Sequence, residues 1–300
     1  NLVLQDRVAV NGDISGLRHR LRAGDVVILE LPSSATDLPV FDAPEAGLEV
    51  SVLYEDSEVV VADKPPGIPG AADRSGKYPG VQGVLQAARP GLSLRMLGRR
   101  EVDVSGCTMF TKSLDVHKRL EGAGQSQAGT TADPLLREEY LALVNGVWSV
   151  PSQRVERAIG PDTRRPGLIS VVASRSKGAR EAVSEVSLEE PFRAHTLVRV
   201  VPETARSHQV RVHLSHLGYP IVADKDYGVR DNLLLSEIKR GYKTRPGVVE
   251  RPLLNRMFLH IARISWPESD GQIRTVESKL PGELDLVLSK LRSFAPRHRN

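Results

Sequence analysis

Two carboxylates stand directly before a turn in the stretch REVDVSG, residues 100–106. Glu101 and Asp103 are followed by Ser-Gly and then by the apolar run CTMF, a pattern typical of a loop that leads into a strand. Carboxylates in such a loop can act as acids, bases or nucleophiles. The stretch therefore predicts a candidate site at Glu101, with Asp103 as a second acidic group.

The densest polar stretch is ETARSHQVRVHLSHLG, residues 203–218. Ser207 is a candidate N-cap, and Arg206 would then lie at the positive end of a short helix. Helical spacing places Gln209 and His213 opposite the apolar positions. The stretch predicts either a binding helix or an amphipathic helix whose polar face is solvated.

Tyr140 begins a strand-like run in REEYLALV, where it could serve the site or pack as a cross-strand aromatic residue. Lys64 opens the rigid turn KPPG, which could place one cation.

The sequence predicts neither a metal site nor a cofactor site. His208, His213 and His216 match no strong zinc signature, and Cys107 lies in an apolar run that favours a buried thiol. The chain contains no G-x-S-x-G elbow, no phosphate-binding glycine loop and no dinucleotide fingerprint.

The elements that would carry these residues are mostly strands. Helical spacing occurs in 113–122, 207–218 and 282–294. The strand-like runs are LEVSVLYEDSEVVVAD, GCTMFTKS, EYLALVNGVW, GLISVVAS, AVSEVSL, HTLVRVVPE, FLHIARISWP and QIRTVESKLP. Many consecutive strands with few helices predict an α+β fold with a large, mainly antiparallel sheet.

Three segments are expected along the chain. Residues 1–32 predict a small module, residues 33–47 are polar and proline-rich and predict a linker, and residues 48–300 predict the main domain. The chain starts with Asn, so we expect an upstream part, in which an organellar address could lie.

Composition favours an anionic partner inside the cell. The chain of 300 residues has a formal charge of +4, and basic clusters occur at 17–22, 95–100, 117–119 and 162–167. Apolar runs are far shorter than the roughly 20 residues of a membrane helix, so no membrane contact is predicted. The single cysteine suits a reducing intracellular compartment, an organelle such as the mitochondrion included.

Taken in order, these motifs resemble the RluA-type pseudouridine synthases, which isomerise uridine in structured RNA, over residues 48–293. Asp63–Gly67 resembles the family element NKPxG. EEYLALVNG resembles KxYxALVxG, which places Tyr140 on the active-site tyrosine. Residues 204–228 resemble TGRTHQIRVHLxHxGxPIxGDxxYG, which places Arg206 on the active-site arginine. The resemblance implies the pseudouridine synthase fold without metal or cofactor.

The family signature HRLDxxTSG is altered in this chain. Aligned on the Ser-Gly pair, Glu101 occupies the position of the catalytic aspartate, and Asp103 falls on an accessory acidic position. Arg99 keeps the family arginine, whereas Gly98 replaces histidine and Arg100 replaces leucine. The extra methylene of Glu101 moves its carboxylate by about 1.5 Å, and a misplacement of about 1 Å can lower a rate roughly 10²-fold.

The resemblance implies a set of site residues and two functions. The first function is RNA binding, in particular of ribosomal RNA in ribosome assembly, with impaired catalysis. The alternative is an active synthase that uses Glu101 as its carboxylate, oriented by Arg206, with Tyr140 stacking on the uracil or moving its proton. A protein-interaction role without RNA is the remaining hypothesis. The N-terminal segment resembles the end of a small RNA-binding module, and the predicted RNA-binding residues are Arg18, Arg20, Arg22, Lys64, Arg99, Arg100, His208, Gln209 and Arg211.

Overall fold

The computed structural model of this chain describes residues 8–11, 13–14, 24–29, 49–71, 79–123, 136–243, 247 and 249–297. The predicted linker, residues 33–47, and the predicted RNA-binding residues Arg18, Arg20 and Arg22 lie outside the described residues.

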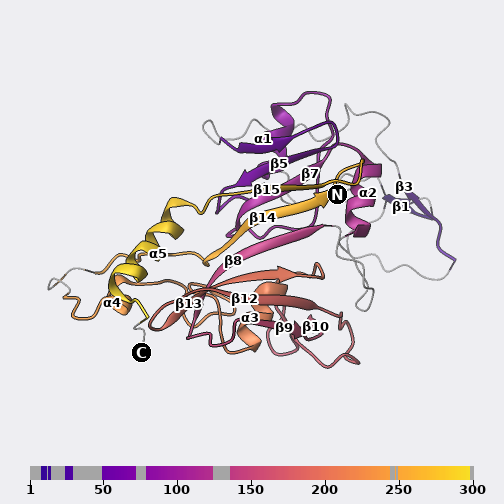
Figure 1. The fold of residues 1–300 in the computed structure, drawn as a ribbon. Helices are drawn as coiled ribbons and strands as arrows, with labels where there is room; N and C mark the ends of the chain where they lie inside the picture. Colours follow the sequence, from indigo (N-terminus) through magenta and orange to yellow (C-terminus); the bar gives the residue numbers. More distant parts are fainter. Residues whose placement is uncertain are drawn as a thin grey trace.

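A ten-stranded sheet forms the body of the protein (Figure 1). Its central path runs β4-β5-β7-β14-β8-β13-β12-β9, with β6 beside β7 and β15 beside β14. Pairing is antiparallel except between β7 and β14, among the residues that the structure describes. The strands are β4 (Ser51–Glu55), β5 (Val59–Lys64), β6 (Arg95–Met96), β7 (Ser105–Thr111), β8 (Arg137–Asn145), β9 (Ser152–Glu156), β12 (Val183–Pro191), β13 (His195–Pro202), β14 (Leu259–Pro267) and β15 (Ile273–Glu277).

Two small sheets accompany the large one. A three-stranded sheet near the N-terminus contains β1 (Val8–Val10), β2 (Asp13–Ile14) and β3 (Val27–Leu29). The hairpin of β10 (Ile159–Pro161) and β11 (Ile169–Val171) forms the other. The segment boundaries at 32 and 47 remain predictions.

Strand β5 shows why an interior strand of the sheet has an uninterrupted apolar run, residues 59–62. Val59 and Val61 belong to the main core, whereas Val60 and Ala62 pack with residues of α1 (Gly80–Ala87) in a second cluster. Because both faces are covered, every position of the run is buried, as in strands with apolar layers on both sides. The neighbouring strand β7 is buried along its whole length.

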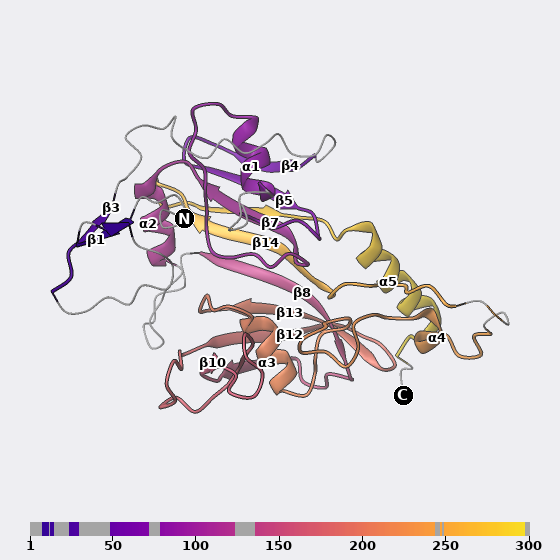
Figure 2. The ribbon, with the colours of Figure 1, turned by 180° about the vertical axis from the view of Figure 1, so that it is seen from behind.

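Few helices accompany the sheet. They are α1, α2 (Leu114–Ala123), α3 (Gln209–His216), α4 (Leu235–Ile238) and α5 (Gly282–Phe294). Helix α5 buries Leu284, Val287, Leu288 and Leu291, an i, i+3, i+4, i+7 stripe. It lies at the opposite end of the molecule from β10 in both views (Figures 1 and 2). No helix in the described part of the chain has the length and hydropathy needed to cross a membrane. The predicted α+β class with a mainly antiparallel sheet is confirmed.

Helix α3 begins later than the sequence predicts. Its N-cap is His208, with φ 58° and ψ 14°, and not Ser207. A left-handed backbone at a residue with a Cβ is strained and needs surrounding structure to hold it.

Candidate active site around Glu101

The loop that carries Glu101 is fastened from the KPPG turn. The carbonyl of Val102 accepts hydrogen bonds from the amide of Gly67 and from Nζ of Lys64, both at 2.9 Å. Nζ of Lys64 also donates to the carbonyl of Pro65 at 2.9 Å. Lys64 is only 1% exposed, and burial, with the nearby cation of Arg256 as a second cause, lowers the pKa of its ammonium to about 7. Lys64 therefore holds the loop from inside the protein.

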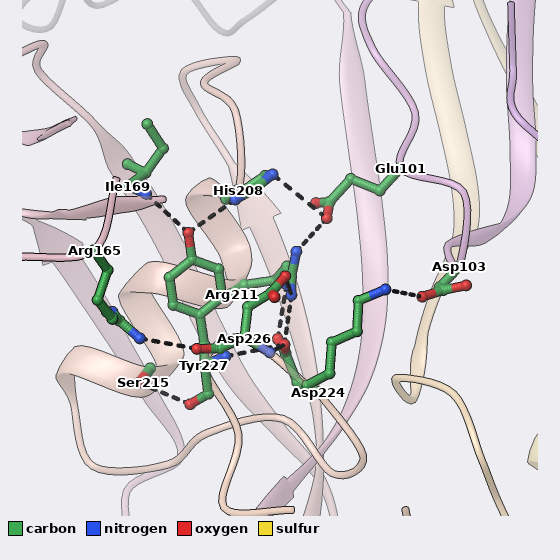
Figure 3. A network of polar contacts seen from close by, with 11 residues as sticks. Glu101, Asp103, Arg165, Ile169, His208, Arg211, Ser215, Asp224, Asp226 and Tyr227 are labelled. Atoms are coloured by element: carbon green, nitrogen blue, oxygen red, sulfur yellow. Dashed lines mark hydrogen bonds and ion pairs between the residues drawn. The ribbon is translucent and has the colours of Figure 1, made fainter. Parts of the chain in front are cut away.

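The carboxylate of Glu101 is ion-paired with Arg211 of α3 (Figure 3). Arg211 is 4% exposed and also binds two further carboxylates. Its Nε donates to Oδ2 of Asp224 at 2.7 Å, and its Nη2 donates to Oδ2 of Asp226 at 2.7 Å. One buried cation thus joins Glu101 to the loop that follows α3.

Asp224 organises that loop. Its Oδ1 accepts the backbone amides of Asp226 at 3.0 Å and of Tyr227 at 3.1 Å. Burial alone would raise the pKa of Asp224, but the hydrogen bonds and charge of Arg211 hold it below its usual value. Asp224 therefore stays ionised, and its fixed charge keeps Arg211 in place.

Tyr227 and His208 complete the cluster (Figure 3). The Tyr227 hydroxyl accepts the Ile169 amide at 3.0 Å and lies 2.8 Å from Nδ1 of His208. The other ring nitrogen of His208, Nε2, faces Glu101 at 3.7 Å. Arg211 also lies over the Tyr227 ring, 4.7 Å from its centre. The cluster can hold and orient one carboxylate at the protein surface.

Tyr140 lies on β8 and is bound by a different carboxylate. Its hydroxyl donates to Oε2 of Glu138 at 2.8 Å, and Oε1 of Glu138 is ion-paired with Arg100. The largely buried charge of Arg100 is thus compensated. Burial first, and the charge of Glu138 second, raise the pKa of the Tyr140 hydroxyl well above its ordinary value.

The polar face of α3 is buried, so the prediction of an amphipathic helix with a solvated polar face is wrong. Gln209 is 3% exposed, and its Nε2 donates to the carbonyl of Val183 at 2.8 Å and to Oγ of Ser184 at 2.9 Å. His213 is fully buried, with Nδ1 3.0 Å from the same Ser184 hydroxyl. These contacts fix α3 on β12.

The expectation that Arg206 orients Glu101 is wrong in this structure. Nε of Arg206 donates to the carbonyl of Glu181 at 3.1 Å, while Glu101, in the described part of the chain, pairs with Arg211 and His208. Arg211, in the first turn of α3, reaches the Glu101 loop, whereas Arg206 precedes the helix and reaches the segment just before β12.

The RNA-binding residues predicted on this domain divide into buried and accessible ones. Lys64, Gln209 and Arg211 are at most 4% exposed, and the Arg100 side chain is also 4% exposed, so direct surface contact by these four is corrected to a role inside the protein. Arg99 is exposed, and His208 is partly exposed. Sequence reasoning missed Glu138, Asp224, Asp226 and Tyr227 as site residues, although the last three lie in the stretch ADKDYG that carries the long motif.

Comparisons with known proteins agree on one family. The profile described as RNA pseudouridylate synthase matches residues 58–216. The chain is 27% identical to ribosomal large subunit pseudouridine synthase C of Haemophilus ducreyi over 299 residues, covering 97% of this chain and 86% of that protein. It is 31% identical to ribosomal large subunit pseudouridine synthase D of Pseudomonas aeruginosa over 232 residues, covering 75% and 66%.

Among solved structures, human RNA pseudouridylate synthase domain containing 1 superposes with a TM-score of 0.57 at 20% identity, covering 90% of this chain and 100% of that one. Human RNA pseudouridylate synthase domain containing 4 gives 0.57 at 19% identity, covering 81% and 93%. At this identity, the likeness to the solved structures establishes the shared fold.

Proposed function

This chain belongs to the RNA pseudouridylate synthase family, in its RluA-type branch, and from that membership we propose that it binds structured RNA while isomerising uridine poorly or not at all. Two relatives are named as synthases of the large ribosomal subunit, so the proposed partner is ribosomal RNA, bound during ribosome assembly. The net charge of +4 is consistent with a phosphate-rich partner.

Glu101 is the observation that carries this proposal. It stands at the position of the catalytic aspartate, one methylene longer, and Arg211 and His208 already engage its charge. A carboxylate displaced by about one bond length loses roughly 10²-fold in rate if the reaction needs fixed geometry. The elements that position Glu101 are nevertheless complete, as expected of a site kept for binding.

One contact favours an active synthase as the second candidate. The ion pair between Glu101 and Arg211 fixes the orientation of the carboxylate, which an acid–base or nucleophilic role requires. In this reading Arg211, and not Arg206, is the orienting cation.

Pseudouridine mapping separates the two candidates. Purified protein is incubated with large-subunit ribosomal RNA that lacks modifications, and pseudouridine is located by chemical modification and reverse-transcription stops. The proposal expects little or no product from the wild type and at least about a 10²-fold faster reaction from Glu101→Asp. Glu101→Gln is the inactive control.

The proposal of impaired catalysis would be overturned if the wild type formed a new pseudouridine at full yield and the Glu101→Gln variant did not. That result would establish the active synthase. RNA affinity is measured on the same samples, so that loss of chemistry is not confused with loss of binding.

We also propose a reducing intracellular compartment, an organelle such as the mitochondrion included. Its support is that the one cysteine of the chain, Cys107, is a buried free thiol. Fractionation of cells that produce the full-length protein tests this location.

A further inference from the structure

A partly buried chain of three polar side chains runs beside the Glu101 cluster. Glu138 divides its two oxygens between Arg100, which ion-pairs with Oε1, and the Tyr140 hydroxyl, which donates to Oε2 at 2.8 Å. The Arg100 side chain is 4% exposed and that of Glu138 is 16% exposed. Because water has little access, the charges of Arg100 and Glu138 compensate each other, and the Tyr140 hydroxyl donates its hydrogen bond to the same carboxylate.

The surroundings of Arg100 are built to receive it. A Cβ on Gly70 would lie 3.2 Å from Cβ of Arg100, and a Cβ on Gly98 would lie 3.0 Å from its Nη1. Nη1 also donates to the carbonyl of Arg99 at 3.2 Å. Nε of Arg100 is buried without a hydrogen-bond partner, so the geometry of the guanidinium is set by Glu138 and by the two glycines.

The two charged positions depart from the family motifs together. Arg100 stands where the signature quoted above has leucine, and Glu138 stands where KxYxALVxG has lysine. A buried arginine alone would leave an uncompensated charge, and a carboxylate in place of lysine supplies the opposite charge. The pair is therefore a coupled feature of this chain.

The coupling determines what Tyr140 can do. Glu138 and Tyr140 lie two residues apart on β8, on the same face of the strand, which brings the hydroxyl to the carboxylate. The hydroxyl proton of Tyr140 is thereby engaged in a hydrogen bond to Glu138. Tyr140 is partly exposed, so its ring can still meet an unstacked base.

We infer that Arg100 and Glu138 are positioning residues for Tyr140: they hold its hydroxyl, so that Tyr140 serves the site through its ring and not through proton transfer. The part of this inference that concerns an RNA base rests on the proposed function. The raised pKa of the Tyr140 hydroxyl, caused by burial and by Glu138, agrees with it.

The positioning is tested without RNA. The Cζ resonance of Tyr140 is observed by NMR on protein labelled with carbon-13 tyrosine and is assigned with Tyr140→Phe. The double variant Arg100→Leu, Glu138→Leu removes both charges of the buried pair together, which avoids leaving one unpaired. We expect this resonance to shift in the double variant and in Arg100→Leu, and to stay close to the wild-type position in Arg100→Lys. An unchanged resonance in the double variant would overturn the positioning role.

The ring role is tested with a uridine-containing RNA hairpin that carries 2-aminopurine beside the loop uridine. Affinity and the fluorescence increase on extrusion should stay within about twofold for Tyr140→Phe and fall roughly tenfold or more for Tyr140→Ala, because stacking on an aromatic ring contributes about 1–3 kcal/mol. Tyr54→Phe is the matched control, since the Tyr54 hydroxyl also donates to a carboxylate, that of Asp56 at 3.0 Å.

Equal losses in Tyr140→Phe and Tyr140→Ala would overturn the ring role, because the hydroxyl would then do more than hold the ring. If the wild type binds no RNA, the proposed function fails and the ring role fails with it. The NMR measurement still decides the Arg100–Glu138 positioning in that case, so the two failures are distinguishable.

Discussion

The carboxylate of Glu101 pairs with a cation that lies deeper in the protein than the carboxylate itself. The Arg211 side chain is 5% exposed, whereas that of Glu101 is 30% exposed. Asp224, on the other side of Arg211, is completely buried. The ion pair is thus anchored from the interior, and Glu101 is its accessible end.

Replacing Arg211 should therefore be costly in a way that replacing Arg206 is not. Arg211→Met leaves Asp224 buried without its cation, and we expect the free energy of unfolding to fall by about 3–5 kcal/mol. Arg206→Met removes one contact to a carbonyl and should change it by no more than about 0.5 kcal/mol. Urea denaturation of both variants measures these changes. Equal losses of unfolding free energy would contradict the prediction, because they would mean that Arg206 stabilises the fold as much as Arg211 does.

Lys64 gives the protein a pH dependence in the alkaline range. Its folded pKa of about 7 lies below the ordinary value of 10.5, so the unfolded chain binds the extra proton between these values. The free energy of unfolding should then rise with pH from about 7 upward, by at most about 1.4 kcal/mol per pH unit. The stabilisation is lost as pH falls toward 7.

Lys64→Met removes this titration, so its free energy of unfolding should rise less steeply with pH than that of the wild type between pH 7 and 9. Denaturation with urea at several pH values measures the difference. The exposed Lys279→Met is the control and should keep the wild-type slope. Parallel curves for the wild type and Lys64→Met would show that the ammonium is charged throughout this range.

At the level of single residues, the sequence predicted which side chains lie near the site. It did not predict which of them are in contact. The family motifs directed attention to Glu101, Tyr140 and the arginines around α3. The partner of Glu101 was missed because Arg211 lies 110 residues away in sequence, and this pairing is set by the packing of α3 against the loop.

At the scale of elements, apolar periodicity was sufficient for α5 and for the buried strands. The predicted range 282–294 is the range of α5, because its stripe repeats over three turns and meets a single apolar surface. Short elements were harder to predict. Helix α3 has only eight residues, and the polar side chains on one of its faces are buried. Hydropathy cannot distinguish a buried polar face from a solvated one.

The second residue of β7 is a glycine, and its replacement tests how closely β7 and β14 approach. Gly106 has φ +106°, and a Cβ there would lie 2.2 Å from the carbonyl oxygen of Ile261 on β14. Gly106→Ala should lower the free energy of unfolding by at least about 3 kcal/mol, through backbone strain and the clash together. Chemical denaturation measures the loss.

Gly218→Ala is the matched control for strain alone. Gly218 has φ +85°, but nothing lies within 4 Å of an added Cβ. Its substitution should cost only about 1–2 kcal/mol. Similar losses at the two positions would mean that β7 and β14 can separate without cost, contrary to the close contact described here.

At the scale of the whole molecule, the site is assembled from segments that are distant in sequence. Lys64, Glu101, Tyr140 and Arg211 come from different strands, loops and helices, and the order β5-β7-β14-β8 brings the strands among them together. Local patterns predicted the α+β class, yet they could not predict this order, because strand pairing is decided by long-range packing. In particular, the parallel pairing of β7 with β14 joins residues 105–106 to 260–261.

The arrangement of charge over the molecule leads to the last prediction. The β10–β11 hairpin docks on the Glu101 cluster through Ile169, whose amide binds Tyr227, and through Arg165, whose Nη1 donates to the carbonyl of Asp226 at 2.9 Å. Arg164 and Lys177, on the segments that flank β11, are exposed. If RNA enters the site from this side, these two cations are placed to contact its phosphates.

Each lost phosphate contact should reduce the slope of log K against log salt by about 1. Arg164→Ala and Lys177→Ala should therefore each weaken binding of large-subunit ribosomal RNA, most strongly at low salt, and each should flatten this slope. Arg297→Ala, an exposed position just beyond α5, should leave the slope unchanged, because α5 lies at the other end of the molecule (Figure 1). Filter-binding titrations between 50 and 300 mM salt, roughly the range in which counterion release is measurable, provide the slopes. A flattening equal in all three variants would mean that RNA is held by the net charge of the molecule and not by this hairpin.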